Sequence, residues 1–277
     1  MKTAFIETSA INWLYDNSAA DAQLTNHLFS SNNFIPVVGM DTIYEMGRCF
    51  KTNATDKASA LFTFLKQLNP IYYCQRSMLY NQELDNLLHG SSVIASLGHY
   101  TAEILAERIK QFSLGIFDSI HEEFISGRQF FWDDCREKLW KPEKNKKSLS
   151  LTFDYYLQHC LKQIESNIPI LQKWLEELTG KKLPAENAVC LMKRLGSYPA
   201  LRTSLYSQFY LNYLIIRNQA TPSEDKFTDS LQLIGASYSS AIVSHDNYLL
   251  NTLANALNPD IQIVKINSLN ETHTIIG

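Results

Sequence analysis

KTAFIETSAINWL, residues Lys2–Leu14, contains in order a strand pattern, an acidic residue and the start of a helix. The stretch Thr3–Ile6 predicts a buried strand that ends at Glu7. The small hydroxylated residues that follow, and then Ile11 and Leu14, predict the first turns of a helix. Open α/β sheets carry their active sites beyond the carboxyl ends of their strands, so Glu7 is expected at such an edge.

Composition limits the class of protein. The chain has 277 residues, 45% of them hydrophobic, which is enough for one large domain or a domain with a sizeable insertion. The net charge of -3 gives no global basic field, so groups that bind a nucleic acid must be local. The five dispersed cysteines favour a reducing compartment and disfavour a zinc site. With no signal peptide and no apolar run near the ~20 residues of a membrane span, we expect a soluble cytoplasmic protein with no membrane partner.

Strand and helix signals alternate at both ends of the chain, which favours parallel strand pairing in an α/β fold. In the N-terminal part the expected elements are a strand at Asn32–Val38, a helix from Met40 or Asp41 through Cys49, a helix at Lys57–Leu68 and a strand at Ile71–Cys74. In the C-terminal part they are a helix at 199–218, a second helix that begins within Thr221–Asp225 and continues through Asp229–Ser239, a strand at Ala241–Val243, a helix at Tyr248–Leu257 and a strand at Ile261–Ile266.

The middle of the chain, roughly residues 90–205, has a helical period, many aromatic residues and few strand signals. We therefore expect residues 1–90 and 199–277 to form the two parts of one α/β domain, and residues 91–198 to form a helical insertion. An insertion of this length is usually functional. Its basic segment Lys141–Lys147 is either a contact for a phosphate backbone or a solvated connector.

Four acids that are distant in sequence stand at strand ends or in helices next to them: Glu7, Glu45, Asp229 and Asp246. Carboxylates gathered in one cleft repel each other and raise each other's pKa values. A divalent cation relieves that repulsion, and Mg²⁺ and Mn²⁺ prefer oxygen ligands. Such a metal can activate water and stabilise an in-line displacement at phosphorus. The pattern therefore indicates phosphodiester hydrolysis.

Each acid alone also has a simpler explanation. Glu7 and Asp246 stand where acids cap helices, and Glu45 could be a solvated helix residue. Asp41 is expected to be a cap or first-turn acid rather than a ligand. Only the four acids together favour a metal site.

Taken in order, these segments resemble the PIN-domain nuclease family. Glu7-Thr8-Ser9 looks like that family's Asp-Thr-Asn opening, in a Glu-Thr-Ser variant. The segment Asp41–Met46, with Arg48 just beyond it, is similar to the segment that holds the second acid. Asp229–Asp246 resembles the helix, strand and acid that supply the third and fourth. The resemblance covers about residues 1–80 and 199–270.

The resemblance implies a Rossmann-like three-layer sandwich with a central parallel sheet, and a metal-dependent endonuclease that usually acts on RNA. The four acids would then be the catalytic ligands of Mg²⁺ or Mn²⁺. Asp225 lies four residues before Asp229 on the same helical face and is a second candidate ligand, although the spacing to Asp246 favours Asp229. The expected substrate-binding residues are Thr8, Ser9, Ser244, Lys144, Lys146 and Lys147.

The expected partner is a nucleic acid, most simply RNA, with a second copy of the chain or a protein inhibitor left open. A non-catalytic PIN-like module that binds nucleic acid or protein is the main alternative. Uncompensated carboxylates argue against it, because a surface that binds phosphate would not gather them. A phosphatase would need a second Asp two residues after the first acid, where this chain has Ser9.

Overall fold

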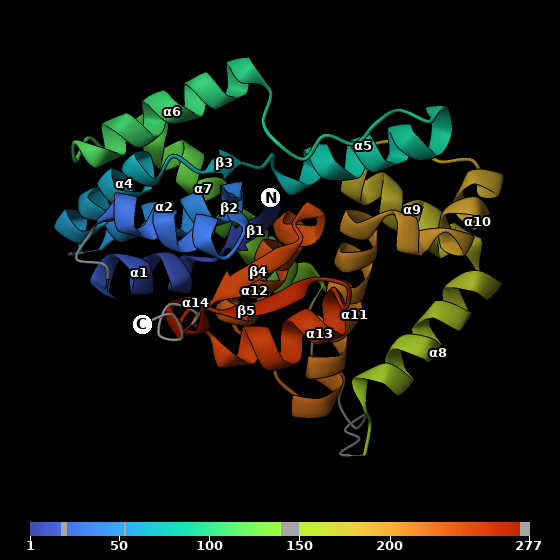
Figure 1. The fold of residues 1–277 in the computed structure, drawn as a ribbon. Helices are drawn as coiled ribbons and strands as arrows, with labels where there is room; N and C mark the ends of the chain where they lie inside the picture. The colour runs from blue at the N-terminus through green and yellow to red at the C-terminus, as the bar shows by residue number, and fades with distance from the viewer. Residues whose placement is uncertain (18–20, 53, 140–149, 272–277) are drawn as a thin grey trace.

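The computed structural model describes residues 1–17, 21–52, 54–139 and 150–271 (Figure 1). Within these residues the strands form a single sheet, in the order β3-β2-β1-β4-β5, and every neighbouring pair is parallel. The strands are β1 Lys2–Ile6, β2 Phe34–Val38, β3 Ile71–Tyr72, β4 Ala241–Ser244 and β5 Gln262–Lys265. The expected α/β class with a central parallel sheet is therefore confirmed.

Helices cover both faces of this sheet. Those of the N-terminal part are α1 Thr8–Asn17, α2 Ala22–Ser31, α3 Met40–Gly47, η1 Arg48–Lys51 and α4 Thr55–Leu68. Those of the C-terminal part are α11 Pro199–Asn218, α12 Glu224–Gly235, η4 Ala236–Tyr238, η5 Leu249–Leu253, α13 Ala254–Leu257 and α14 Ser268–Glu271.

The alternation of side chains along each strand produces the layers. Ala4 and Ile6 of β1 are buried in the core that contains residues of α1, α2 and α4. Phe5, between them, faces the other way and packs with residues of α11, α12 and α13. A sheet that is apolar on both faces must be covered on both, which gives a three-layer arrangement.

The strand order reverses direction at β1. The chain runs outward from β1 through β2 to β3, and then returns to the other side of β1 with β4. The carboxyl ends of β1 and β4 adjoin, since Ile6 pairs with Val243. This is the point where open α/β sheets leave a crevice for ligands. Glu7 and Ser244 lie at that point.

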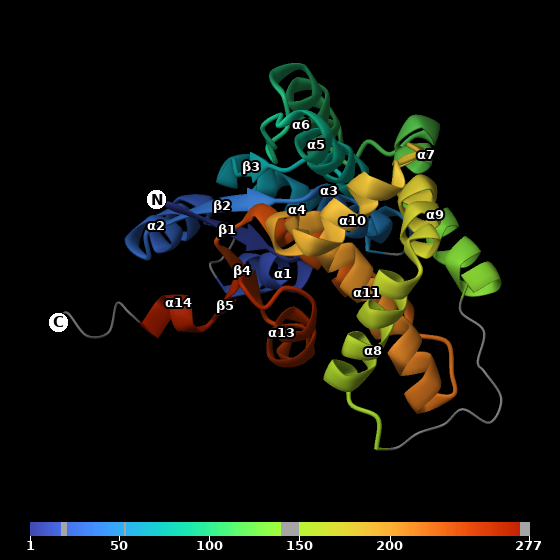
Figure 2. The same ribbon diagram turned by 90° about the vertical axis from the view of Figure 1, so that its right-hand side faces the viewer.

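The middle of the chain is helical, as expected. Its elements, with α5 before them, are α5 Arg76–His89, α6 His99–Ser113, α7 Ser119–Asp134, η2 Cys135–Leu139, α8 Phe153–Ser166, α9 Ile168–Thr179, α10 Ala185–Lys193 and η3 Leu195–Ser197. Figure 2 shows α8, α9 and α10 beside α11, on the opposite side of the molecule from α2 and α14. Within the described residues, none of the helices is long and apolar enough to cross a membrane.

These helices are divided between two cores. Leu105, Ile109 and Phe112 of α6 are buried in the core under the sheet, where α6 packs on α4. Helices α5, α9, α10 and α11 instead build a second core, with Leu84 and Leu171 among its fully buried side chains. The expected substrate-contact residues Lys144, Lys146 and Lys147 lie outside the described residues.

Several boundaries differ from those expected. Helices α2 and α5 were not anticipated; Asp21 caps α2 by accepting hydrogen bonds from the backbone N–H groups of Gln23 and Leu24. The third strand is shorter than Ile71–Cys74. The helix expected to begin within Thr221–Asp225 does begin there, at Glu224, where the Ser223 side chain caps it; its α-helical part ends at Gly235 and a 3-10 turn, η4, follows, where a single helix to Ser239 was expected.

A buried carboxylate connects the second core to the sheet. Glu83 of α5 accepts hydrogen bonds from the backbone N–H groups of Ala200 (2.8 Å) and Leu201 (2.7 Å), at the start of α11. It also accepts one from the Tyr238 hydroxyl (2.7 Å). Burial raises the pKa of Glu83 to about 7 despite these hydrogen bonds and the nearby charge of Arg202. Glu83 is thus a titrating group inside the fold.

Glu83 should make stability depend on pH. Between its ordinary pKa of 4.5 and about 7, the folded state keeps a proton that the unfolded state has lost. The free energy of unfolding should therefore fall by about 3 kcal/mol as pH rises through this window. Glu83→Gln cannot titrate at this position. In urea titrations, the free energy of unfolding of the wild type minus that of this variant should therefore fall by about 3 kcal/mol from pH 4.5 to 7.5. Asp85→Asn, an exposed change on the same helix, should give a constant difference.

Gly39 is expected to be needed for its lack of a side chain. It is the N-cap of α3, and a Cβ added there would lie 2.7 Å from two ring atoms of the buried Phe5. Gly39→Ala should cost about 1–3 kcal/mol by overpacking, measured by urea unfolding. Gly98 is the matched control, because it caps α6 in a similar extended conformation with nothing within 4 Å of its added Cβ. Equal losses in the two variants would contradict the role assigned to Phe5.

Candidate functional site

Four elements deliver the candidate acids to one edge of the sheet. Glu7 follows β1 directly, and Asp246 lies two residues beyond the end of β4. Glu45 is on α3, the helix that leaves the end of β2. Asp229 is on α12, which packs against α3. Parallel strands end at the same edge, so residues separated by more than 200 positions meet there.

Glu7 is buried and held on both carboxylate oxygens. Its Oε1 accepts a hydrogen bond from the backbone N–H of Ser9 (2.9 Å). Its Oε2 accepts from the hydroxyl groups of Ser9 and Ser244, the latter at 2.9 Å. Burial raises the pKa of Glu7, and the charge of Glu45 raises it further, while the Ser9 hydrogen bonds lower it. The two serines therefore fix the carboxylate and favour its charged form.

Glu45 is held by a second small network. Its Oε2 accepts hydrogen bonds from the Thr8 hydroxyl (2.6 Å) and from the side-chain amide of Gln232 (2.6 Å). The same amide nitrogen lies 2.9 Å from the Thr8 oxygen, and the Gln232 carbonyl accepts from the Thr42 hydroxyl at 2.8 Å. Gln232 and Thr42 have no exposed surface. The network thus locks α1, α3 and α12 around Glu45.

Asp229 is the most perturbed acid of the group. Its pKa is raised from 3.8 to about 8, first by burial and then by the charges of Glu7, Asp246 and Glu45. Among the described residues its carboxylate has no hydrogen-bond or ion-pair partner. All four acids therefore interact electrostatically, and the charged form of Asp229 is disfavoured.

Asp246 is exposed and has two functions in the structure. Its Oδ1 accepts hydrogen bonds from the backbone N–H groups of Tyr248 (2.6 Å) and Leu249 (3.0 Å), which caps the helical segment that follows. Its charge also acts on Asp229. The ammonium group of Lys226 lies over the Tyr248 ring at 2.7 Å from the centroid, and interacts with the charges of Asp229 and Asp246.

The structure brings Glu7, Glu45, Asp229 and Asp246 together and leaves other candidates aside. Asp225 is exposed and is not among the charges that raise the pKa of Asp229. Asp41 is buried in the first turn of α3 and forms an ion pair with Arg76 at 2.8 Å, which fits the expectation that it is not a ligand.

Three residues expected to bind substrate contact the acids. Thr8 donates to Glu45, and Ser9 and Ser244 donate to Glu7. Ser244 also accepts the backbone N–H of Asp246 at 2.9 Å, so it joins two of the acids. The hydroxyl groups therefore orient the carboxylates in this structure.

The sequence reasoning missed two residues of the site, Gln232 and Lys226. Both lie three positions from Asp229 on α12, in opposite directions, so helical spacing places them on the same face. A buried Gln between Leu231 and Leu233 is also unusual in an apolar run. These signals could have identified both residues.

The donor chemistry suits a hard divalent cation, but the spacing is looser than in a coordination shell. Carboxylate oxygens are the ligands Mg²⁺ and Mn²⁺ prefer, and the raised pKa of Asp229 reports negative charge that a cation would relieve. In the part of the chain that the structure describes, no group of three or more His, Cys, Asp or Glu side chains is placed so that it could hold a metal ion. The four acids thus suit a divalent cation in chemistry and charge, whereas their placement among the described residues does not form a group of three that could hold one.

Comparison of the chain with protein-family models, with curated proteins and with solved structures finds no match.

Removing the charge of Asp229 should stabilise the protein in EDTA at high pH. From about pH 3.8 to about 8, the folded state retains a proton that the unfolded state has lost, so stability falls as pH rises. Asp229→Asn abolishes this term, and its melting temperature should exceed that of the wild type by several degrees at pH 9 but not at pH 4. Differential scanning calorimetry at both values tests this. Asp225→Asn, one turn away and exposed, should show no such pH dependence. If the two variants gained the same melting temperature, the gain would come from lowering the net negative charge and not from the buried position of Asp229.

Proposed function

We propose that this chain is a metal-dependent endonuclease with a PIN-like fold, and that its substrate is RNA. The observation that carries the proposal is the convergence of Glu7, Glu45, Asp229 and Asp246 at one edge of the sheet; burial, and then the charges of the other three acids, raise the pKa of Asp229. Structural acids are normally paired with cations or hydrogen bonds, whereas unrelieved like charges concentrate at functional sites. The parallel sheet and the position of the acids at its switch point support the same conclusion.

Glu7, Glu45, Asp229 and Asp246 are the residues that would hold Mg²⁺ or Mn²⁺. When bound there, such a cation supplies an activated water and charge stabilisation for displacement at phosphorus. The chain's own contribution is to hold the carboxylates ready. Ser9 and Ser244 fix Glu7, while Thr8 and Gln232 fix Glu45, so each of these two carboxylates is held in one orientation.

The four acids differ in their exposure to solvent and in their distance from a cation. Glu7 is buried, Glu45 and Asp229 are partly buried, and Asp246 is exposed. Lys226 lies close to Asp229 and Asp246, so it offsets part of their charge. A phosphodiester approaching from solvent would therefore meet Asp246 and Lys226 first and the orienting hydroxyl groups last.

One observation favours a non-catalytic module of the same fold. Both oxygens of Glu7 and one oxygen of Glu45 already accept hydrogen bonds from neutral donors. A site that served only structure or partner binding would satisfy its acids in this way. Under that alternative, removing Glu7 would lower stability without changing any hydrolytic activity.

The proposal predicts metal-dependent cleavage of RNA that each acid is needed for. Glu7→Gln, Glu45→Gln, Asp229→Asn and Asp246→Asn should each reduce cleavage of a labelled mixed-sequence RNA in Mg²⁺ or Mn²⁺ by about a hundredfold or more. Each substitution preserves the shape of the side chain and removes its charge, so the fold, measured by circular dichroism, should change little. Asp225→Asn is the matched control and should retain activity.

The same assay includes single-stranded DNA and a phosphomonoester, which separate an RNA-cleaving enzyme from a general nuclease and a phosphatase. Activity that survives EDTA, or that survives all four substitutions, would exclude the proposed chemistry. Loss of activity in Asp225→Asn rather than in Asp229→Asn would reassign the third ligand.

A further inference from the structure

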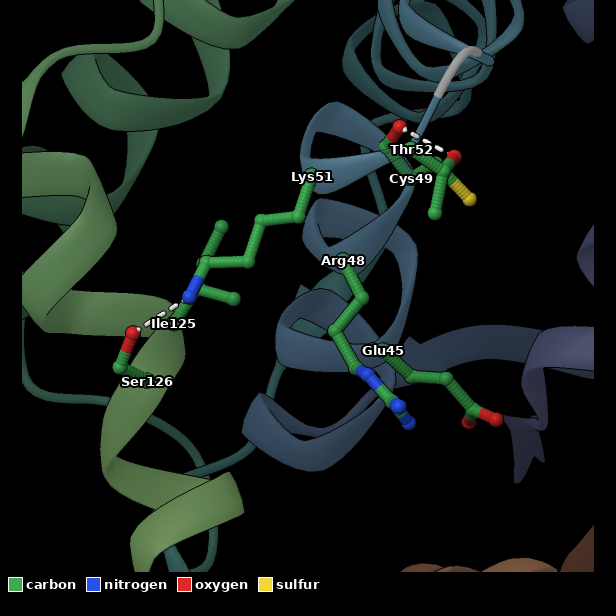
Figure 3. Close-up of a pocket in the computed structure, with 7 residues that line it drawn as sticks. All are labelled: Glu45, Arg48, Cys49, Lys51, Thr52, Ile125 and Ser126. Atoms are coloured by element: carbon green, nitrogen blue, oxygen red, sulfur yellow. Dashed lines mark hydrogen bonds between the residues drawn. The ribbon is translucent and has the colours of Figure 1, made fainter.

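A basic pocket adjoins the acid cluster on the side of α3 (Figure 3). It has a volume of about 300 Å³ and lies between η1 and α7. Its lining residues are Glu45, Arg48, Cys49, Lys51, Thr52, Ile125 and Ser126. Glu45 belongs both to this pocket and to the site described above, so the two are neighbours. Figure 3 shows Arg48 next to Glu45, with Lys51 reaching toward Ser126 on α7.

The pocket is built by close packing of two helices. Gly47, at the end of α3, has no side chain, and a Cβ there would clash with the Ile125 side chain of α7. This close approach brings Ser126 within 2.7 Å of the Lys51 ammonium group, which donates a hydrogen bond to it. The wall formed by α7 is therefore fixed against η1.

Its two cations are paired weakly and retain donors. Arg48 forms an ion pair with Glu224 at 2.6 Å, with the two side chains 40% and 27% exposed. Lys51 forms one with Glu122 at 3.3 Å, and the Glu122 side chain is 58% exposed. Pairs this exposed contribute little stability, so an incoming anion can share or replace them. A guanidinium has five donors and an ammonium three, which is more than these partners use.

We propose that this pocket binds a backbone phosphate of the nucleic acid next to the one that is cleaved. Arg, Lys and hydroxyl side chains are the usual partners of phosphate oxygens, and Arg48, Lys51 and Ser126 provide all three. Glu45 and Arg48 are separated by about one helical turn, so a strand held at Arg48 passes beside the acids. The pocket places two cations beside the acids, together with Glu45 and with the paired Glu224 and Glu122. This inference rests on the proposed nuclease function for the identity of the ligand.

The test measures binding of a fluorescent single-stranded 12-nucleotide RNA by anisotropy at several salt concentrations. Every protein carries Asp229→Asn, so that the probe is not cleaved. Arg48→Gln combined with Lys51→Gln should weaken binding by about tenfold or more, and should lower the slope of log affinity against log salt by about 0.7, the value for one phosphate of a single strand.

Two matched variants separate charge from structure. Glu224→Gln combined with Glu122→Gln removes the same two ion pairs but leaves both cations, so it should bind as tightly as the parent or more tightly. Lys57→Gln removes an exposed cation of α4 outside the pocket and should leave the slope unchanged. If the glutamate variant weakens binding as much as the cation variant, the effect is structural and the proposal is overturned.

Neutral methylphosphonate linkages, placed singly along the RNA, locate the contact. One position should weaken binding to the parent protein and cause no further loss in the Arg48→Gln, Lys51→Gln variant. The proposal is overturned if every neutral linkage that weakens binding to the parent protein weakens binding to that variant equally. It is also overturned if the parent protein does not bind the RNA. Cleavage assays with Asp229 intact report on the proposed function separately: cleavage without a pocket effect removes this inference alone, and a pocket effect without cleavage removes the nuclease proposal alone.

Discussion

Repulsion among four carboxylates at the carboxyl ends of β1, β2 and β4 is the constraint on which the site depends. The strand order places these ends together, and folding therefore forces like charges toward each other. The four carboxylates are not stabilised equally. Glu7 and Glu45 are stabilised by hydroxyl and amide donors, whereas Asp229 is left to titrate far above its ordinary pKa. A group held in that state costs stability, which is the usual relation between active sites and the structures that carry them.

Helix α12 connects this constraint to the rest of the molecule. One of its faces contributes Phe227, Leu231 and Ile234 to the second core. Another contributes Leu233 to the core above the sheet, and a third carries Asp229 and Gln232 to the site. Because α12 belongs both to the second core and to the core that contains Phe5, the position of Asp229 relative to Glu45 depends on how the second core packs. The helical part of the chain is thus joined to the acid cluster through α12, and also through α5 and α7, which contact α3 at Asp41 and at Gly47.

Much of the fold could be predicted because it depends on local patterns. The strands at Thr3–Ile6 and Ala241–Val243 are continuous apolar runs that end in polar residues, and both were located within a residue or two. The helix over 199–218 was located without error. Helix α5 was missed because its surface is mixed: it buries Glu83 together with Leu79 and Leu84, and an internal acid does not fit an amphipathic pattern.

The site could be predicted only in part, for a related reason. Acids at strand ends are visible in a sequence, since strand ends are visible. The contacts that fix them depend on helix orientations that are set by packing, so the hydrogen bonds from Gln232 to Glu45 and from Ser244 to Glu7 could not be derived beforehand. The pocket lined by Arg48 and Lys51 is similarly hidden, because it depends on Gly47 letting α7 approach. A glycine that permits contact leaves no chemical signal of its own. Sequence reasoning therefore identifies the groups that carry charge more readily than the neutral residues that bring those groups together.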